Sequence, residues 1–168
     1  MRYVLAVLLL LFAALVQSSV LPYFPVLGVY PNLVLILVVC WTVVRGQKEA
    51  MVVVPIGGLC LSLVGSQPVG VALLAVAPIV LLAEVREARV TTSDLLLALA
   101  LVLVSSLVYE GVLMVALRAA GETMSWGDGV RRVVLPTAIV NVLFTPPLYW
   151  LVWWRTMATR QRVRSYLG

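Results

Sequence analysis

Residues 50–83 read AMVVVPIGGLCLSLVGSQPVGVALLAVAPIVLLA, and this stretch contains no Asp, Glu, Lys or Arg. Charge is scarce elsewhere too, because only 11% of the 168 residues are charged whereas 63% are hydrophobic. A water-soluble domain needs a charged exterior, and a helix needs about 20 apolar residues to cross a hydrocarbon core. The sequence therefore predicts an integral membrane protein and leaves no room for a soluble catalytic domain.

The apolar runs predict an all-α bundle of about six transmembrane helices. A β-barrel would show alternating polarity, whereas these runs are continuous, and a helix satisfies its own backbone within the bilayer. We expect one polytopic transmembrane domain over residues 1–154, with an uncleaved first helix, and a basic cytoplasmic tail over residues 155–168. The expected spans cover residues 3–21, 26–44, 50–64, 69–83, 95–117 and 133–154.

The third and fourth expected spans are short for a full crossing. One interpretation is a helical hairpin whose uncharged turn, residues 65–68, lies near the outer surface. The other is a single long re-entrant element. The sequence leaves both open.

Lysine and arginine residues predict how the chain is threaded. With the N-terminus inside, nine of the twelve basic residues fall in cytoplasmic segments, and only Arg118, Arg131 and Arg132 fall outside. Positive residues are retained on the cytoplasmic side, so both ends are expected there. The net charge of +5 then reflects topology and contact with membrane lipids, not nucleic acid. The tail either docks a cytoplasmic partner or anchors the topology; its basic residues are Arg155, Arg160, Arg162 and Arg164.

No catalytic, metal or cofactor grouping is evident. The chain contains no histidine, and its two cysteines, Cys40 and Cys60, lie inside apolar runs without metal-ligand spacing. Gly57-Gly58 lacks the Lys-Ser/Thr that follows in a phosphate-binding loop. We therefore expect a protein that is not an enzyme.

Glu110 is the most informative polar residue within the spans, in the expected outer half of the fifth. An ionised carboxylate is costly there, so it should face the bundle, become protonated, or pair with a cation. Candidate partners are Arg118, Arg131, Arg132 or a residue of another subunit. Glu110 is thus either a contact, proton or substrate site, or a carboxylate close enough to the outer headgroups to stay hydrated.

Three amides and two glycines are candidate packing and partner contacts. Gln17, Asn32 and Asn141 lie in or near spans, where amides hydrogen-bond across helices. Gly57 and Gly58 mark a face of small residues on the third span, where another helix can approach closely.

Prolines within the spans should bend or break the helices and free backbone carbonyls. Bent helices either line a cavity or shape a compact bundle. The prolines concerned are Pro55, Pro78, Pro136, Pro146 and Pro147.

Several segments resemble the MreD family over nearly the whole chain. They include Gln17 near the end of the first span and Pro31-Asn32 followed by an apolar helix and Arg45-Gly46. Gly57-Gly58-Leu59 through Pro68-Val69-Gly70 resembles the family's third span and the turn after it. The last span matches at Pro136, Asn141 and Pro146-Pro147-Leu148-Tyr149. The family often carries aspartate where Asn32 stands and another near Ser62, so both carboxylates are absent here.

The resemblance implies a non-enzymatic scaffold or regulatory subunit of the bacterial cell-shape (elongation) complex, in the inner membrane. Such a subunit would pair with an MreC-like single-span protein and help connect MreB filaments to peptidoglycan synthases. The resemblance also implies a fold similar to the substrate-binding subunits of energy-coupling-factor transporters, with room for a central cavity.

Two other functions stay open. Bent helices and Glu110 are compatible with a small-molecule transporter or a substrate-binding membrane subunit. An accessory subunit of a respiratory or photosynthetic complex is less favoured, because no histidine is available to ligate heme or chlorophyll.

Overall fold

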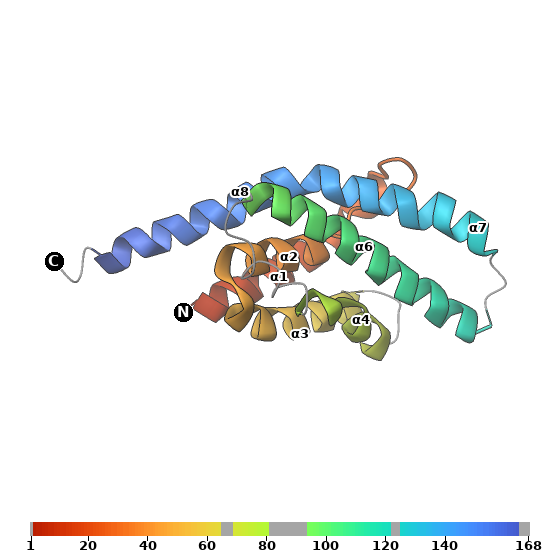
Figure 1. Ribbon diagram of the computed structural model, residues 1–168, viewed down its shortest axis with the longest axis horizontal. Coiled ribbons are helices and arrows are strands. Elements are labelled where there is room, and N and C mark those ends of the chain that lie inside the picture. Colours follow the sequence, from red (N-terminus) through yellow and green to blue (C-terminus); the bar gives the residue numbers. More distant parts are fainter. Residues whose placement is uncertain (1, 65–68, 81–93, 122–124, 165–168) are drawn as a thin grey trace.

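The computed structural model describes residues 2–64, 69–80, 94–121 and 125–164, and helices make up most of this part of the chain. Figure 1 shows them as an elongated bundle in which α8 runs along one side and α6 starts beside α8 and slants away from it. The main helices correspond in order to the six predicted runs; they are α1 (Arg2–Ser19), α2 (Leu33–Arg45), α3 (Gln47–Val64), α4 (Val69–Val76), α6 (Asp94–Ala119) and α8 (Leu135–Arg164).

Three helical stretches are long and apolar enough to cross a membrane. They are Val4–Tyr23, Asp94–Ala119 and Trp126–Thr156. Leu33–Arg45 and Gly70–Val80 are apolar but shorter. A multi-pass helical membrane protein is therefore confirmed for the described residues, whereas a full crossing by each of the shorter helices stays a prediction.

Helix α2 lies at the centre of the bundle. Its residues from Val34 to Val43 are all buried, and it packs against α1, α3, α6 and α8. A helix that is apolar on every side has no polar face to expose and is most stable when other helices surround it. The sequence of α2 therefore explains its position.

The expected start of the second span at residue 26 was wrong, because α2 begins at Leu33. The segment before it turns through Leu27 and Gly28, which have positive φ angles of 55° and 78°, and Val26 pairs with Val29 in an isolated β-bridge. Pro31 lacks a backbone N–H, and Asn32 caps the helix with its side chain. These local features end the loop and start the helix seven residues later than expected.

Helices α3 and α4 pack against each other, which favours the hairpin over a single re-entrant element. The expected turn at residues 65–68 and the end of the fourth span at 81–83 lie outside the described residues. Helix α4 ends at Val76, two residues before Pro78, as expected from the clash between a proline ring and a preceding helical residue.

Helix α8 is much longer than its predicted span of 133–154. It follows the short helix α7 (Trp126–Gly129) and a π-helical turn, η2 (Val130–Val134), and continues to Arg164. The basic segment from 155 is therefore a helical extension in its backbone. Pro146 and Pro147 lie inside α8 without interrupting it, although Figure 1 shows that α8 is bowed.

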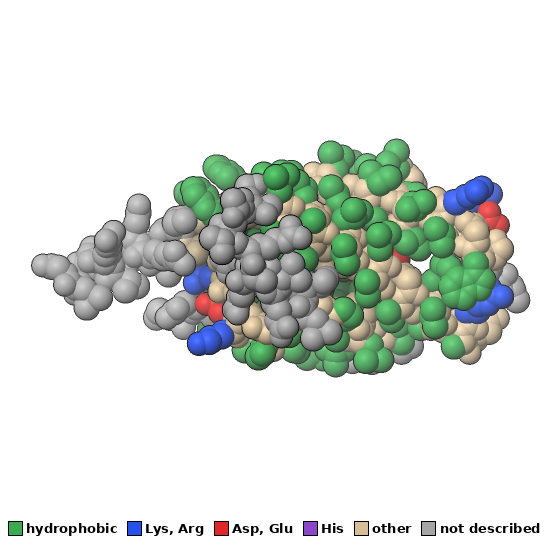
Figure 2. Space-filling model, in the orientation of Figure 1, with side chains coloured by type: hydrophobic (Ala, Val, Ile, Leu, Met, Phe, Trp, Pro, Cys, Tyr) green, Lys and Arg blue, Asp and Glu red, His purple; other side chains and the backbone are tan. Residues whose placement is uncertain are grey.

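The outer surface of the bundle is apolar between two charged ends. Large hydrophobic side chains are exposed along α1, such as Phe12 at 67%, and along α8, such as Leu143 at 66%. Figure 2 shows green side chains over the middle of the molecule and most of the visible blue and red ones near its two ends. This distribution suits a bilayer whose hydrocarbon contacts the middle and whose headgroups contact the ends.

Candidate functional site

Asn141 lies at the centre of a buried polar cluster. Its Oδ1 accepts the backbone N–H of Asn32 at 2.7 Å, and its Nδ2 donates to Ser106 Oγ at 2.9 Å. Asn141 is 0% exposed. One side chain of α8 therefore connects the loop before α2 with the middle of α6.

Asn32 and Gln17 satisfy the first turn of α2. Asn32 Oδ1 accepts the N–H of Leu35 at 3.1 Å, and Gln17 Oε1 accepts the N–H of Val34 at 3.3 Å. The first N–H groups of a helix have no partner within it, and an unpaired one is costly at membrane depth. The three predicted amides, one of them from α1 and one from α8, thus meet at the N-terminus of α2.

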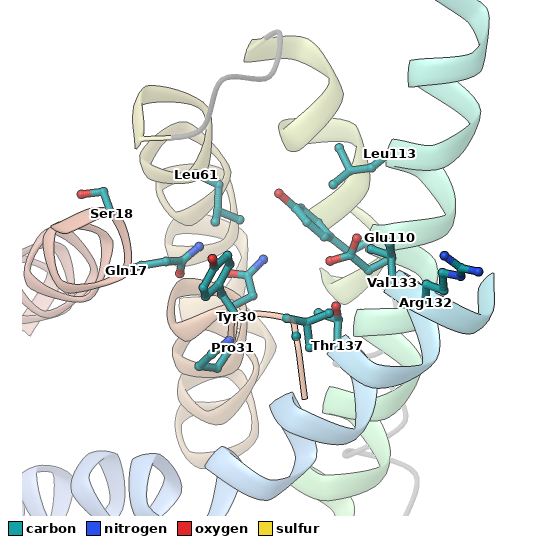
Figure 3. A pocket seen from close by; sticks show the side chains of 14 residues that line it. Gln17, Ser18, Tyr30, Pro31, Leu61, Glu110, Leu113, Arg132, Val133 and Thr137 are labelled. Carbon is teal, nitrogen blue, oxygen red and sulfur yellow. The ribbon is translucent and has the colours of Figure 1, made fainter. Parts of the chain in front are cut away.

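A cavity of about 440 Å³ lies beside this cluster. Residues of α1, the segment 28–32, α3, α6, η2 and α8 line it. Figure 3 shows that Gln17 and Tyr30 lie on one side and Glu110 and Thr137 on the other. Non-helical backbone at membrane depth is tolerated where it lines such a cavity.

Glu110 is half-buried in the wall of this cavity. It also lines a neighbouring cavity of about 190 Å³, together with Met114 and Val134. The ion pairs found between described side chains are Arg45–Glu49 and Asp128–Arg132, so neither involves Glu110.

The three arginines considered as partners of Glu110 are placed differently. Arg132 lines the same cavity, but its Nε lies 3.7 Å from Asp128 Oδ1, and Figure 3 shows its guanidinium directed away from Glu110. The Arg118 guanidinium lies 5.3 Å from the centroid of the Trp126 ring. Arg131 is exposed.

A second polar cluster, which the sequence reading missed, lies near the opposite end of the bundle. Trp41 Nε1 donates to Glu49 Oε2 at 3.0 Å, and Arg45 Nη1 lies 3.7 Å from Glu49 Oε1. Arg45 Nε also donates to Thr156 Oγ1 of α8 at 3.2 Å. The four-residue spacing of Trp41, Arg45 and Glu49 was the available signal for this cluster in the sequence.

Gly57 and Gly58 face two different helices. A Cβ added to Gly57 would overlap Cγ2 of Val38 on α2, and one added to Gly58 would lie 2.8 Å from Cγ2 of Val76 on α4. Both glycines are buried. Their lack of side chains therefore allows α3 to pack closely on both neighbours.

In the basic tail, the structure describes side chains only up to Thr156. Arg155 is exposed, and its guanidinium lies 5.8 Å from the centroid of the Trp154 ring. The side chains of Arg160, Arg162 and Arg164 lie outside the described part.

No group of acidic or cysteine side chains in the described ranges could hold a metal ion. Cys40 and Cys60 are both buried as free thiols. The amides and Glu49 instead join helices to one another, and Glu110 lines the cavity.

Comparison with known protein families gives a match that covers nearly the whole chain. The family model for the rod shape-determining protein MreD matches residues 1–155. No curated protein and no solved structure matches the chain. The expected likeness to energy-coupling-factor subunits therefore stays a prediction, whereas the family match takes in every described helix up to Arg155 of α8.

Proposed function

The chain belongs to the MreD family, the rod shape-determining membrane proteins of the elongation machinery, and from this premise we propose that it pairs with an MreC-like single-span protein. The family is non-enzymatic and resides in the inner membrane. The observation that carries the proposal is the extent of the family match, residues 1–155, which includes the helical bundle. The chain would act as a scaffold that helps connect MreB filaments to peptidoglycan synthases.

We propose that the helices cross the membrane six times and that both ends of the chain are cytoplasmic. In support, α1 begins and α8 ends toward the same side of the molecule in Figure 1. Arg45 ends α2 and Lys48 lies in the first turn of α3, whereas Arg131 and Arg132 lie in η2 before α8, three proposed passes later. In this topology the excess of basic residues lies on the side where α1 begins and α8 ends, which agrees with the retention of basic residues on the cytoplasmic side. The basic end of α8 would then lie against anionic headgroups.

The buried amides and glycines would serve this role indirectly, by holding the bundle in one arrangement. Gln17, Asn32 and Asn141 join α1, α2 and α8 through their hydrogen bonds. Gly57 and Gly58 allow α3 to approach α2 and α4. A scaffold needs a fixed surface for its partner, and these contacts support such a surface.

A second candidate function, a small-molecule transporter or substrate-binding subunit, is favoured by the cavity at Glu110. Its volume of about 440 Å³ lies within the usual range for ligand sites, roughly 300–1,000 Å³.

A pull-down of the tagged full chain from its native membrane in mild detergent, read by mass spectrometry, tests the two functions. The scaffold predicts near-stoichiometric recovery of an MreC-like single-span protein, with cell-wall synthases in lower amount. Recovery of paired ATPases with a coupling membrane subunit would favour transport. Stoichiometric purification of the chain without any single-span partner would contradict the scaffold.

A further inference from the structure

We infer that the cavity at Glu110 binds a ligand that carries a primary ammonium group, with the Glu110 carboxylate as its counter-ion. This binding does not depend on the proposed pairing with an MreC-like protein. The argument rests on the charge, the polar lining and the position of the cavity.

Charge is the first reason. Two charged side chains, Glu110 and Arg132, line the cavity within the described residues. Arg132 is directed away from the carboxylate in Figure 3 and approaches Asp128 instead. The inner wall of the cavity is therefore acidic.

The cost of this carboxylate is the second reason. Glu110 lies nine residues before the end of α6, about 13 Å along the helix axis from Ala119. A carboxylate at such depth is expensive without a cation, and glutamine would fill the same volume without charge. An ammonium group in the cavity would offset this cost with charge-assisted hydrogen bonds.

The rest of the lining suits an ammonium group. Tyr30 and Tyr109 add aromatic rings, which attract cations, Thr137 adds a hydroxyl oxygen, and the Gln17 amide oxygen can accept a second hydrogen bond besides that from Val34. An ammonium group has three donors and no acceptor, so several oxygens can surround it. The lining therefore provides more than the single contact that Glu110 would make.

The wall of the cavity is irregular at two points. Segment 28–32 is non-helical, and η2 is a π-helical turn in which Leu135 N–H bonds to Val130 O. Pro136 follows directly and has no N–H to give to residue 132. Single π-helical turns inside helices are frequent at functional sites. Here the turn places Arg132 and Val133 at the cavity.

The ammonium group could belong to an aminophospholipid such as phosphatidylethanolamine or to a soluble amine. Both share the chemistry that Glu110 recognises. The exposed hydrophobic side chains of the bundle would contact lipid, whereas the cavity volume admits a small soluble molecule. The test below separates the two sources.

The full chain, purified in one detergent, would be titrated with short-chain phosphatidylethanolamine, short-chain phosphatidylglycerol and soluble phosphoethanolamine, and bound adducts counted by native mass spectrometry. We expect the wild type to bind the amine lipid, phosphoethanolamine or both, and to discriminate against phosphatidylglycerol. Glu110→Gln should weaken amine binding about 10- to 100-fold, as expected for the loss of a hydrogen-bonded charge. Asp94→Asn is the matched control, because it removes an exposed carboxylate from the other end of α6.

Competition by phosphoethanolamine would identify a soluble ligand, and binding of the amine lipid without such competition would identify a headgroup. Equal binding of both lipids, or equal amine binding by wild type and Glu110→Gln, would overturn the inference. Circular dichroism would show whether Glu110→Gln is folded. If Glu110→Gln is not folded, Val133→Trp provides the test instead. It keeps the Glu110 carboxylate and adds a large side chain at a residue that lines both cavities, which should reduce amine binding. Undiminished amine binding by Val133→Trp would equally overturn the inference.

Discussion

Asn141 Oδ1 accepts the backbone N–H of Asn32 at 2.7 Å, although 109 positions separate the two residues along the chain. The same Asn141 donates to Ser106 on α6. These hydrogen bonds connect the start of α2 to α8 and, through Asn141, to α6, directly after a non-helical segment. Asn32 also caps α2 with its side chain and lines the cavity. The geometry of the cavity therefore depends on the hydrogen bond between Asn32 and Asn141.

Replacing Asn141 by leucine tests this contact. We expect Asn141→Leu to lower the free energy of unfolding by about 1–3 kcal/mol, because two interhelical hydrogen bonds are lost and a buried N–H keeps no acceptor. The measurement is a denaturant titration in mixed micelles, followed by circular dichroism.

Ser105→Ala is the matched control for Asn141→Leu. Ser105 is as buried as Ser106, its neighbour on α6, but its hydroxyl has no hydrogen-bond partner among the described residues. Its removal should therefore change the stability by less than about 0.5 kcal/mol. Equal losses in the two variants would mean that the Asn141 contact contributes nothing specific.

Close packing of α3 predicts that alanine is too large at both glycines. Gly57→Ala and Gly58→Ala should each cost about 1–3 kcal/mol of stability, as overpacking in cores does. Adding Val38→Ala to Gly57→Ala should restore the stability, because the atom that overlaps the new Cβ is a methyl of Val38. Adding Val76→Ala to Gly58→Ala should restore the stability only in part, since the new Cβ also lies 3.2 Å from the Leu73 backbone.

Gly70→Ala provides the control for the glycine variants. A Cβ at Gly70 meets nothing within 4 Å, and the residue is exposed in α4. Alanine favours helix over glycine, so stability should stay equal or rise by up to about 1 kcal/mol. If all three variants behave alike, then helix propensity and not contact with α2 and α4 governs these positions.

The helices could be predicted from the sequence because each contains an apolar run with few or no charged residues. The centre of the bundle could also be anticipated from α2, whose residues between Asn32 and Arg45 are apolar except for Thr42. The start of α2 was missed because hydropathy continues smoothly across residues 26–30, while the deciding features are the positive φ of Leu27 and Gly28 and the cap at Asn32. Such backbone features leave little trace in hydropathy.

The polar residues themselves could be found, but not their partners. Gln17, Asn32 and Asn141 stand out because amides are rare in apolar runs, yet their meeting depends on how α1, α2 and α8 pack. Glu110 was equally visible, and its cavity arises from five separate segments besides α6. Glu49 was overlooked because it follows a short turn, while its partners Trp41 and Arg45 lie on the preceding helix.

Glu49 should be important for stability. Glu49→Ala would leave the largely buried guanidinium of Arg45 without its counter-ion and the N–H of Trp41 without an acceptor, so we expect a loss of about 3 kcal/mol in unfolding free energy. The double variant Arg45→Ala/Glu49→Ala should lose less unfolding free energy than the sum of the two single variants, since neither charge then remains without its counter-ion. Lys48→Ala, at an exposed neighbouring position, should change stability by less than about 0.5 kcal/mol.

The proposed topology can be tested by the side from which single cysteines react. Cys40 and Cys60 are buried and would be replaced by alanine before a cysteine is introduced in place of Lys48 or Arg131. Both positions are exposed in the structure. A membrane-impermeant maleimide should label Arg131→Cys in cells with an opened outer envelope, and Lys48→Cys only after the inner membrane is permeabilised. The reverse pattern would place both ends of the chain outside, and basic residue counts would then not determine the orientation of this bundle.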